Sequence, residues 1–508
     1  MRLLILFITL IIVFICLFSY TVNTYIMNDE HMYVSAGVLA QSNTVYKDFA
    51  YLQMPYLPLV YAGIYKFTGT DLYLLYARYF SFLTVFASVV IIYLIGYLLT
   101  KEFLLALMGV LLYSFNEVLI HSMGFAWNAA PPIVFSLLAV YCYLYGTKRD
   151  DVKPLYLFIT GLCIALAAGL KLYYITMVIP FVACSIVLPK SFTLGEKLRY
   201  SLFPLLFGFT MGLLPALYYF ISDPQIFLFN NIGFHKLNYE WHLENNLLTV
   251  ASTTSLLPKI RYLIQVAGWQ TSMPLLIAVP IAIVFVAYNH KSLTRIFTLV
   301  YSNVQLFLIV SVLLVSILSV MIPSPLWQHH LAYPFPFIVL LVFTLYNYIS
   351  LDHKKIYLSV IAIVVLFISI YGFPVVSSYI QHLTDYDRWT PVRFHREAQS
   401  ITEHIGKDGK IVTIEPLIAL EGGRMVYNEF STGHFLFHVS EILNSQQREL
   451  YSTTSLPSLQ YWLEEVQPAG IVIPPNYRRV DQFRESIDHT YYFVIENASG
   501  NYEIYVRK

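Results

Sequence analysis

The chain has 508 residues, of which 57% are hydrophobic and 12% are charged, and its mean hydropathy is +0.62. These values lie far from those of soluble proteins and predict a polytopic membrane protein. The net charge of +1, together with the lack of a basic stripe interleaved with aromatic residues, argues against a nucleic-acid partner.

Hydropathy predicts the membrane spans, because a spanning helix needs about 20 mostly apolar residues. About eleven segments meet this requirement, namely 3–22, 72–99, 102–116, 130–146, 155–170, 172–188, 200–221, 271–288, 302–322, 331–350 and 356–375. Segments 102–116 and 130–146 are short, so we expect them to be tilted, broken or enclosed by other helices. The first segment lacks a small-x-small cleavage pattern and is predicted to be a retained anchor helix.

The positive-inside rule gives the orientation of these spans. A cytoplasmic start places the basic residues of the short turns inside, namely Arg2, Lys101, Lys148, Arg149, Lys153, Lys190, Lys197, Arg199, Lys291, Arg295, Lys354 and Lys355. Segments 23–71, 117–129, 222–270 and 323–330 then lie outside, with the whole chain after the last span. We therefore expect a multi-pass protein of the cytoplasmic membrane with an extracytoplasmic carboxyl-terminal region.

The sequence changes character after residue 380. Strand-like runs at 410–414, 470–473 and 491–495 and a helical pattern at 456–466 predict a small soluble α/β domain over 381–508, following a membrane domain over 1–380. All cysteines lie in apolar runs, at Cys16, Cys142, Cys163 and Cys184, so disulfides and cysteine metal sites are not expected.

Asp29 and Glu30 lie just beyond the first span, where a polar and aromatic segment begins. Ionised carboxylates are costly in hydrocarbon, so this pair predicts a site in water at the lipid interface. The alternative is that both residues only cap or solvate the start of a helix.

Further motifs follow the acidic pair in order: Tyr46-Lys47-Asp48-Phe49, Gln53-Met54-Pro55, Arg78 with Ser81, and a glycine-containing helix from Gly161 to Lys171. This order resembles membrane glycosyltransferases of the GT-C superfamily, especially the protein O-mannosyltransferases (glycosyltransferase family 39) and the aminoarabinose transferases. The resemblance covers most of the membrane part. One departure is Asn128, where relatives often carry an aspartate in the second outer loop, and Glu117 is a weak substitute.

The resemblance implies a polytopic α-helical GT-C fold and an inverting glycosyltransferase that moves a sugar from a polyprenyl-phosphate donor to a lipid, glycan or protein of the cell envelope. Asp29 would be the base that takes the acceptor proton, and Glu30 would support its geometry or a cation. A divalent metal ion held by Asp29 is an alternative way of positioning the phosphate.

Positive groups must face the departing phosphate. The candidates are Arg78, Lys171, His329 and His330, although Arg78 and Lys171 could equally be helix-end residues that reach toward the interface. Tyr33, Lys47, Asp48 and Gln53 of the first outer loop are candidate substrate-binding residues. The polar and aromatic segment 231–242 could stack on sugar rings or could form an interfacial aromatic belt.

Two other functions remain open from the sequence. A transporter or flippase for lipid-linked glycans is disfavoured by the scarcity of charge in the spans and by the lack of a duplicated half. A noncatalytic envelope assembly protein would use its outer domain as a binding module. Outer loops that converge on a cavity open to lipid and water would favour the enzyme, and a through-channel would favour transport.

Overall fold

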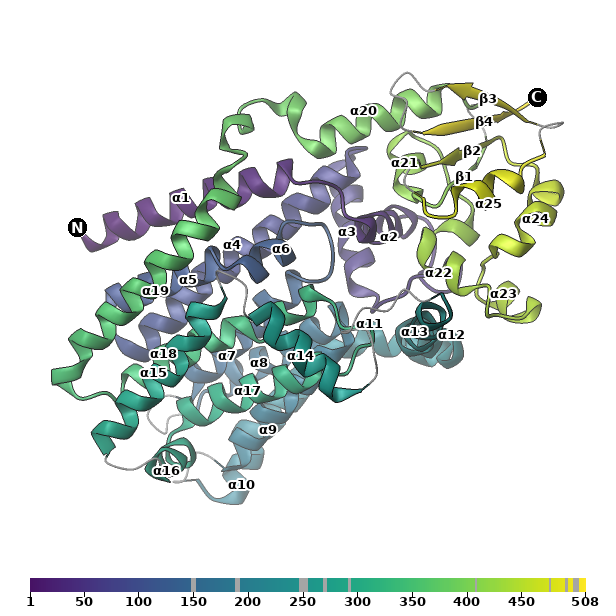
Figure 1. The fold of residues 1–508 in the computed structure, drawn as a ribbon. Coiled ribbons are helices and arrows are strands. Elements are labelled where there is room, and N and C mark those ends of the chain that lie inside the picture. Colours follow the sequence, from purple (N-terminus) through teal and green to yellow (C-terminus); the bar gives the residue numbers. More distant parts are fainter. Residues whose placement is uncertain are drawn as a thin grey trace.

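The computed structural model is mainly helical and describes residues 1–147, 152–187, 192–245, 255–267, 272–290, 294–406, 409–474, 477–488, 492–496 and 502–508 (Figure 1). Each predicted span coincides with an apolar helix. In chain order these helices are α1 (Arg2–Asn23), α4 (Tyr73–Thr100), α5 (Phe103–Ser114), α7 (Pro131–Gly146), α8 (Pro154–Leu170), η2 (Leu172–Met177) with α9 (Val178–Val187), α11 (Phe203–Ser222), α15 (Met273–His290), α17 (Val304–Val320), α18 (Phe335–Tyr346) and α19 (Leu351–Ser377).

Within the described residues, 5 helical stretches are long and apolar enough to cross a membrane, namely Arg2–Asn23, Tyr73–Thr100, Leu194–Ser222, Gln328–Tyr346 and Leu351–His382. Helix α5 and the following α6 (Glu117–Met123) form a pair bent by 60°, which could be a sixth span. This bend agrees with the broken helix expected around 102–116. The other apolar helices are shorter, so a total of eleven spans stays a prediction.

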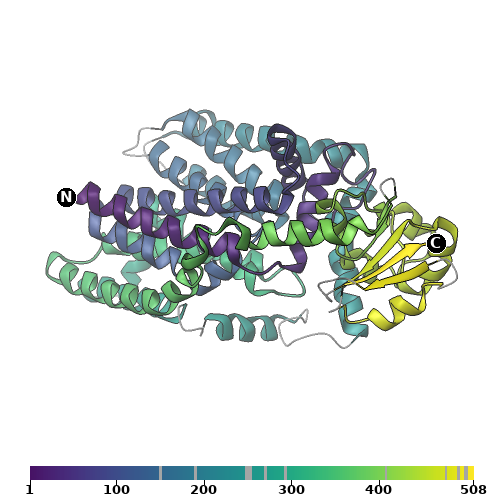
Figure 2. The ribbon, with the colours of Figure 1, turned by 90° about the horizontal axis from the view of Figure 1, so that it is seen from above.

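The helices run between two ends of an elongated molecule (Figures 1 and 2). The amino terminus, α10 (Leu194–Lys197) and α16 (Thr294–Ser302) lie at one end, and the carboxyl-terminal strands lie at the other. The predicted outer and inner segments are thus separated along the bundle, while the sidedness of the membrane stays a prediction. Lys148, Arg149, Lys190 and Lys291 lie outside the described residues.

Close packing of α8 on α11 depends on glycine. A Cβ atom at Gly161 would lie 1.9 Å from the Leu205 carbonyl oxygen, and one at Gly208 would lie 2.0 Å from the Phe158 carbonyl oxygen. Small residues let helix backbones approach closely in membranes, where apolar side chains gain nothing by leaving lipid. This contact holds α8, the helix that Lys171 follows, against α11.

Short elements form a layer at the end of the bundle that carries the carboxyl-terminal strands. They are α2 (Asn28–Leu39), α3 (Tyr56–Thr68), α12 (Pro224–Leu228), η4 (Phe229–Gly233) and α13 (Phe234–Glu244) (Figure 1). Two further short elements, α14 (Leu256–Ala267) and η6 (Gln328–Ala332), precede α15 and α18 in the chain. Together with α6, they come from the segments that the sequence places outside.

The carboxyl-terminal part contains a 4-stranded mixed sheet in the order β1-β2-β4-β3. Its strands are β1 (Ile411–Val412), β2 (Gly470–Ile473), β3 (Tyr492–Glu496) and β4 (Glu503–Arg507). Its helices are α20 (Thr390–Glu403), α21 (Pro416–Glu421), α22 (His434–Val439), α23 (Ser445–Leu450), α24 (Leu459–Val466) and α25 (Val480–Glu485). The three predicted strands and the helix at 456–466 are confirmed, β4 was not predicted, and independent folding of 381–508 stays a prediction.

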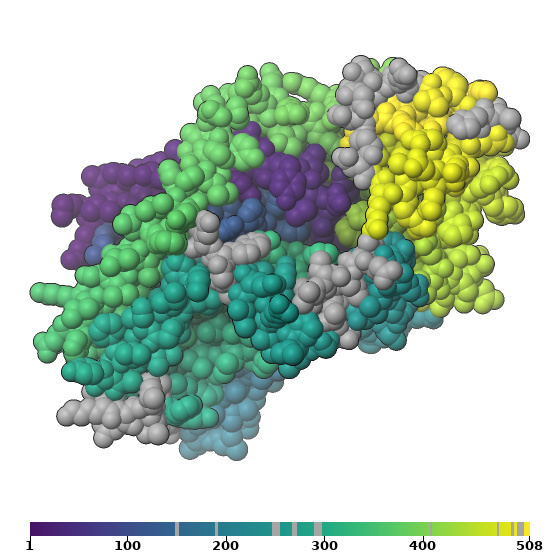
Figure 3. Space-filling view, viewed as in Figure 1, coloured from purple at the N-terminus to yellow at the C-terminus, as the bar shows by residue number. Residues whose placement is uncertain are grey.

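This part packs directly on the first outer segment and on the start of α4. The buried carboxylate of Glu421 accepts a hydrogen bond from the backbone N–H of Leu74 (2.7 Å), and Ser431 Oγ donates to the Ala50 carbonyl (3.2 Å). In the space-filling view, the yellow carboxyl-terminal residues lie against the purple and teal segments of the outer layer (Figure 3). The carboxyl-terminal part therefore covers the layer that contains Asp29.

Candidate active site

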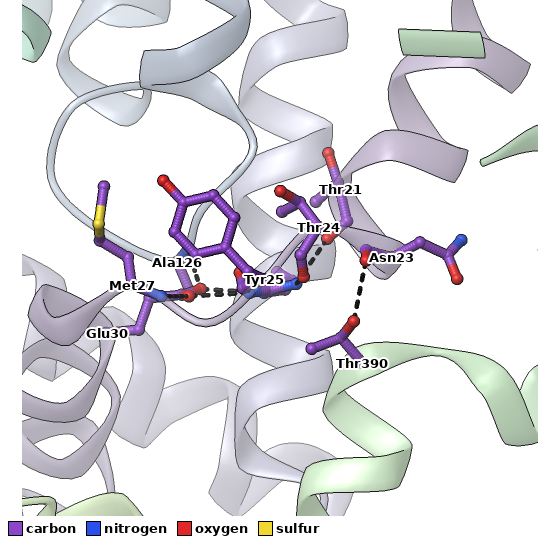
Figure 4. Close-up of polar contacts among 9 residues, drawn as sticks. Thr21, Asn23, Thr24, Tyr25, Met27, Glu30, Ala126 and Thr390 are labelled. Carbon is purple, nitrogen blue, oxygen red and sulfur yellow. Dashed lines mark hydrogen bonds and ion pairs between the residues drawn. The ribbon is translucent and has the colours of Figure 1, made fainter. Parts of the chain in front are cut away.

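Asp29 and Glu30 point to different partners, because consecutive residues of a helix project about 100° apart. The Glu30 side chain is fully buried and accepts two hydrogen bonds from Arg78, at 2.9 Å and 2.8 Å. It also accepts the backbone N–H groups of Met27 (3.0 Å) and Ala126 (2.7 Å) (Figure 4). Glu30 thereby ties the start of α2 to α4 and to the second outer segment.

Arg78 satisfies all its donors within the protein. Besides the two bonds to Glu30, its guanidinium donates to the carbonyl oxygens of Thr21, Thr24 and Tyr25, at 3.0, 2.9 and 2.7 Å. These carbonyls lie at and just after the end of α1, where helix carbonyls lack partners in the helix and favour a cation. A guanidinium has five N–H donors, so none is left for a phosphate oxygen. We therefore assign Arg78 a structural role in place of the expected phosphate contact.

Asp29 has a partly exposed side chain in the first turn of α2. Burial raises the pKa of its carboxyl to about 6, while the positive charge of Lys171 acts in the opposite direction. Burial, and then the negative charge of Asp29, raise the pKa of Tyr33, one helical turn further along α2. Asp29 thus combines access to water with a proton affinity close to that needed for a base near neutral pH.

Lys171 provides the positive charge of this site. It lies in the turn between α8 and η2, it is 5% exposed, and its Nζ lies 5.4 Å from the centre of the Tyr173 ring. Among the described residues, no side chain or carbonyl accepts a hydrogen bond from this amine. Burial lowers the pKa of Lys171 to about 7, and the negative charge of Asp29 acts in the opposite direction. In its protonated form this buried amine is suited to bind an anionic oxygen.

His329 and His330 approach Lys171 from η6, before α18. The His330 ring lies 5.9 Å from the Tyr173 ring, and the His329 ring lies 4.6 Å from the Trp127 ring. Both imidazoles lie within electrostatic range of Lys171. The structure therefore brings together Asp29 of α2, Lys171 after α8 and the two histidines of η6, which are three separate segments.

Gln53 forms a second side of the site, together with two residues that the sequence did not assign to it. Asn128 donates to Gln53 Oε1 (3.2 Å) and to the Leu170 carbonyl (3.4 Å), and the Nε2 atom of His235 lies 3.5 Å from the Gln53 amide nitrogen. The pKa of His235 is lowered to about 4, first by burial and then by Lys171. The outer segments around Gln53, Asn128 and His235 therefore converge near Lys171.

The other candidate residues of the first outer segment lie in a turn. Asp48 Oδ2 accepts the backbone N–H of Thr44 (2.7 Å), and the Lys47 side chain is exposed. The structure gives neither residue a contact with Asp29 or Lys171. Glu117 begins α6 and lies 3.9 Å from His121 of the same helix.

A metal site at Asp29 finds little chemical support in this arrangement. No group of three or more histidine, cysteine or carboxylate side chains in the described part of the chain could hold a metal ion. The charged groups that act on Asp29 are Lys171, whose positive charge lowers the pKa of the carboxyl, and Glu30, whose negative charge raises it.

No protein-family model and no curated protein matches the chain. Its structure aligns with the crystal structure of ArnT from Cupriavidus metallidurans bound to undecaprenyl phosphate, with a TM-score of 0.61 and 11% identity over 99% of this chain and 97% of ArnT. The chain has the ArnT fold. The apo structure of ArnT gives a TM-score of 0.60 at 10% identity with the same coverage. This likeness in fold agrees with the resemblance to the aminoarabinose transferases that the motif order predicted, while the number of spans and the separate carboxyl-terminal domain stay predictions.

Proposed function

We propose that this chain is a glycosyltransferase that moves a sugar from a polyprenyl-phosphate donor to a hydroxyl group of an envelope acceptor, at the outer face of the cytoplasmic membrane. The observation that carries the proposal is the pairing of Asp29, a partly exposed carboxylate of raised pKa, with Lys171, a buried amine without a hydrogen-bond acceptor among the described residues. A base for the acceptor and a cation for the leaving phosphate are the two groups that the reaction needs.

In the proposed reaction, the acceptor oxygen attacks the anomeric carbon while Asp29 takes the hydroxyl proton. The bond between the anomeric carbon and the phosphate oxygen breaks, and its electron pair leaves with the polyprenyl phosphate. Lys171 faces the charge that develops on this phosphate, and His329 and His330 contribute donors beside it. Attack from the side opposite to the phosphate inverts the anomeric centre.

Glu30 and Arg78 act in this scheme as positioning residues. Their bonds hold the first turn of α2 against α4 and the 124–128 segment, and this turn carries Asp29. Gln53, Asn128 and His235 line the opposite side, and they have donors and acceptors suited to sugar hydroxyls. Tyr33 adds an aromatic group next to Asp29.

The fold also supports the lipid partner, since one ArnT structure holds undecaprenyl phosphate. A flippase would need a path for the sugar across the bilayer, and the charged groups of this site instead come from segments at a single end of the bundle (Figure 1). A noncatalytic protein would have no use for an unsatisfied buried amine beside a carboxylate, which is costly to maintain.

The direct test is release of polyprenyl phosphate from the donor. Purified protein in proteoliposomes would be incubated with undecaprenyl-phosphate sugars and with envelope extract as acceptor, and the lipid products would be separated by mass spectrometry. Acceptor-dependent release of undecaprenyl phosphate supports the proposal. Movement of intact donor between leaflets without cleavage would instead establish a flippase.

Lys171→Met should weaken binding of undecaprenyl phosphate by about 10-fold to 100-fold, because a hydrogen bond to a charged group contributes on the order of 1.5–3 kcal/mol. Binding would be measured on purified protein by native mass spectrometry. Lys236→Met is the matched control, since Lys236 is exposed and its ion-pair partner among the described residues is Glu240 (3.9 Å) on the surface of α13. Equal affinity of the Lys171 variant and the control would remove Lys171 from the phosphate site.

The transfer rate should fall as the pH is lowered through about 6, because Asp29 must be ionised to accept a proton and its pKa is raised to that value. Lys171 lowers this pKa, so Lys171→Met should move the fall to a higher pH. The measurement is the pH profile of kcat/KM for both proteins. A profile that is flat between pH 5 and 7, in roughly the range where such a base titrates, would contradict the role of Asp29.

A further inference from the structure

A polar groove at the end of α1 has no part in the proposed reaction. Its volume is about 430 Å³, and it is lined by Asn23, Tyr379, His382, Arg388, Thr390 and Arg393. Asn23 ends α1, Tyr379 and His382 follow α19, Arg388 lies on the connection to α20, and Thr390 and Arg393 lie in the first turn of α20. The groove therefore opens where two apolar helices reach the predicted outer surface of the membrane.

The groove is positively charged and its donors are largely free. Arg393 has no hydrogen-bond or ion-pair partner among the described residues. Arg388 uses its Nε–H on Asp385 (2.8 Å), which leaves the ends of its guanidinium without a protein acceptor in the described part of the chain. The other nearby carboxylate, Asp387, pairs with Arg396 instead. No carboxylate lines the groove itself.

The helices below the groove present apolar side chains to their surroundings. Ile8 and Ile12 of α1 are about half exposed, at 48% and 46%, and Ile363, Leu366 and Ile370 of α19 are exposed as well. The purple α1 and the green segment around α19 lie side by side in the space-filling view and in the view from above (Figures 2 and 3). Acyl chains could follow these apolar surfaces and bring a headgroup to the two arginines.

We propose that this groove binds the phosphate of an anionic membrane phospholipid. Guanidinium groups bind phosphate oxygens through paired donors, and basic pockets beside membrane helices are suited to lipid headgroups. The Tyr379 hydroxyl and the His382 ring add polar groups at the same depth as the interface, where aromatic residues gather. Free phosphate lacks the acyl chains and would lose the apolar part of the contact.

The groove and the active site share one stretch of chain. Thr390 Oγ1 donates to the Asn23 carbonyl (2.9 Å), and Arg78 binds the carbonyls of Thr21 and Thr24 on either side of it (Figure 4). A lipid bound between Asn23 and Arg393 would therefore stabilise the segment that holds Glu30 and Arg78. The bound phospholipid would act as a structural ligand rather than as a substrate.

The test compares the full-length wild type with R388Q/R393Q, and with R396Q as a matched control on the same helix as Arg393. Purified protein would be titrated with phosphatidylglycerol, phosphatidylcholine or inorganic phosphate, with native mass spectrometry and thermal unfolding as readouts. We expect the wild type and R396Q to bind phosphatidylglycerol equally. The affinity of R388Q/R393Q for this lipid should be lower by about tenfold or more. Inorganic phosphate should not stabilise any of the three proteins.

Equal binding of phosphatidylglycerol by the wild type and R388Q/R393Q would overturn the proposal, as would equal affinity of the wild type for phosphatidylcholine. Stabilisation by inorganic phosphate that is lost in R388Q/R393Q would identify a free-phosphate site instead. The binding of undecaprenyl phosphate, measured with the Lys171→Met variant, reports separately on the proposed transferase site. The two proposals can therefore fail independently.

Discussion

Asp29→Asn should lower the rate of sugar transfer by about 10²-fold to 10⁴-fold, the usual contribution of a general base, without reducing the amount of folded protein in the membrane. The amide keeps the size and shape of the side chain but cannot take the acceptor proton. Asp29 is partly exposed and makes no ion pair with an arginine, so its substitution should disturb packing little. Donor binding should persist, because the phosphate is expected to contact Lys171.

Turnover would be measured as release of undecaprenyl phosphate at equal membrane abundance of each variant. Asp71→Asn is the matched control, since the Asp71 side chain is 76% exposed and lies 3.9 Å from His395, outside the Lys171 cluster. Near-normal turnover by Asp29→Asn would reject the base assignment. The role would then pass to Asp48, the other carboxylate of the same outer segment with a partly exposed side chain.

The membrane helices could be predicted from the sequence because their signal is local. A run of apolar residues must be helical in lipid, where every backbone group needs a partner within its own segment. The strands at 470–473 and 492–496 were equally visible as short apolar runs between polar turns. Strand β4 was not predicted, because its apolar run is short and has a charged residue at each end, Glu503 and Arg507.

The members of the site could be predicted only where a motif marked them. Asp29, Lys171, His329 and His330 were candidates from the sequence, and the structure brings them close together. His235 was noted only as part of a polar and aromatic segment. Its approach to Gln53 depends on how α13 packs against the first outer segment, a contact between residues 182 positions apart in the chain. No local pattern carries that information.

The motif that contains Arg78 did not predict which groups this side chain binds. The sequence offered two interpretations, a phosphate contact and a residue reaching toward the interface. The structure shows a third arrangement, in which the side chain is 0% exposed and binds the carbonyls that follow α1. The free carbonyls at the end of α1 were a physical signal for a nearby cation, but the sequence could not show which cation would reach them.

Arg78→Met should therefore destabilise the protein rather than weaken donor binding. Removal of one partner from a buried ion pair leaves an unpaired charge and typically costs about 3–5 kcal/mol. Here Glu30 would lose two hydrogen bonds, and the carbonyls of Thr21, Thr24 and Tyr25 would lose their donor. The expected result is a large fall in Tm in detergent and low abundance in membranes.

Glu30→Gln should be nearly as harmful, because the Arg78 charge would stay buried without its carboxylate. If Glu30 only assisted Asp29, its substitution would instead lower the activity and leave the stability unchanged. Because the two residues act as a unit, the loss of stability in the double variant Glu30→Gln, Arg78→Met should be smaller than the sum of the losses in the two single variants. The double variant should still be less stable than the wild type, since the carbonyls after α1 stay without a donor.

The measurement is thermal unfolding of the single and double variants, together with binding of undecaprenyl phosphate to the protein that remains folded. Arg396→Gln is the control, because its ion pair with Asp387 is exposed and such pairs contribute little to stability. A phosphate-binding Arg78 would give the opposite pattern, with an unchanged Tm and weaker donor binding. That result would show that the guanidinium leaves Glu30 to serve the donor, and the bonds that now fix α2 to α4 would have to break during each turnover.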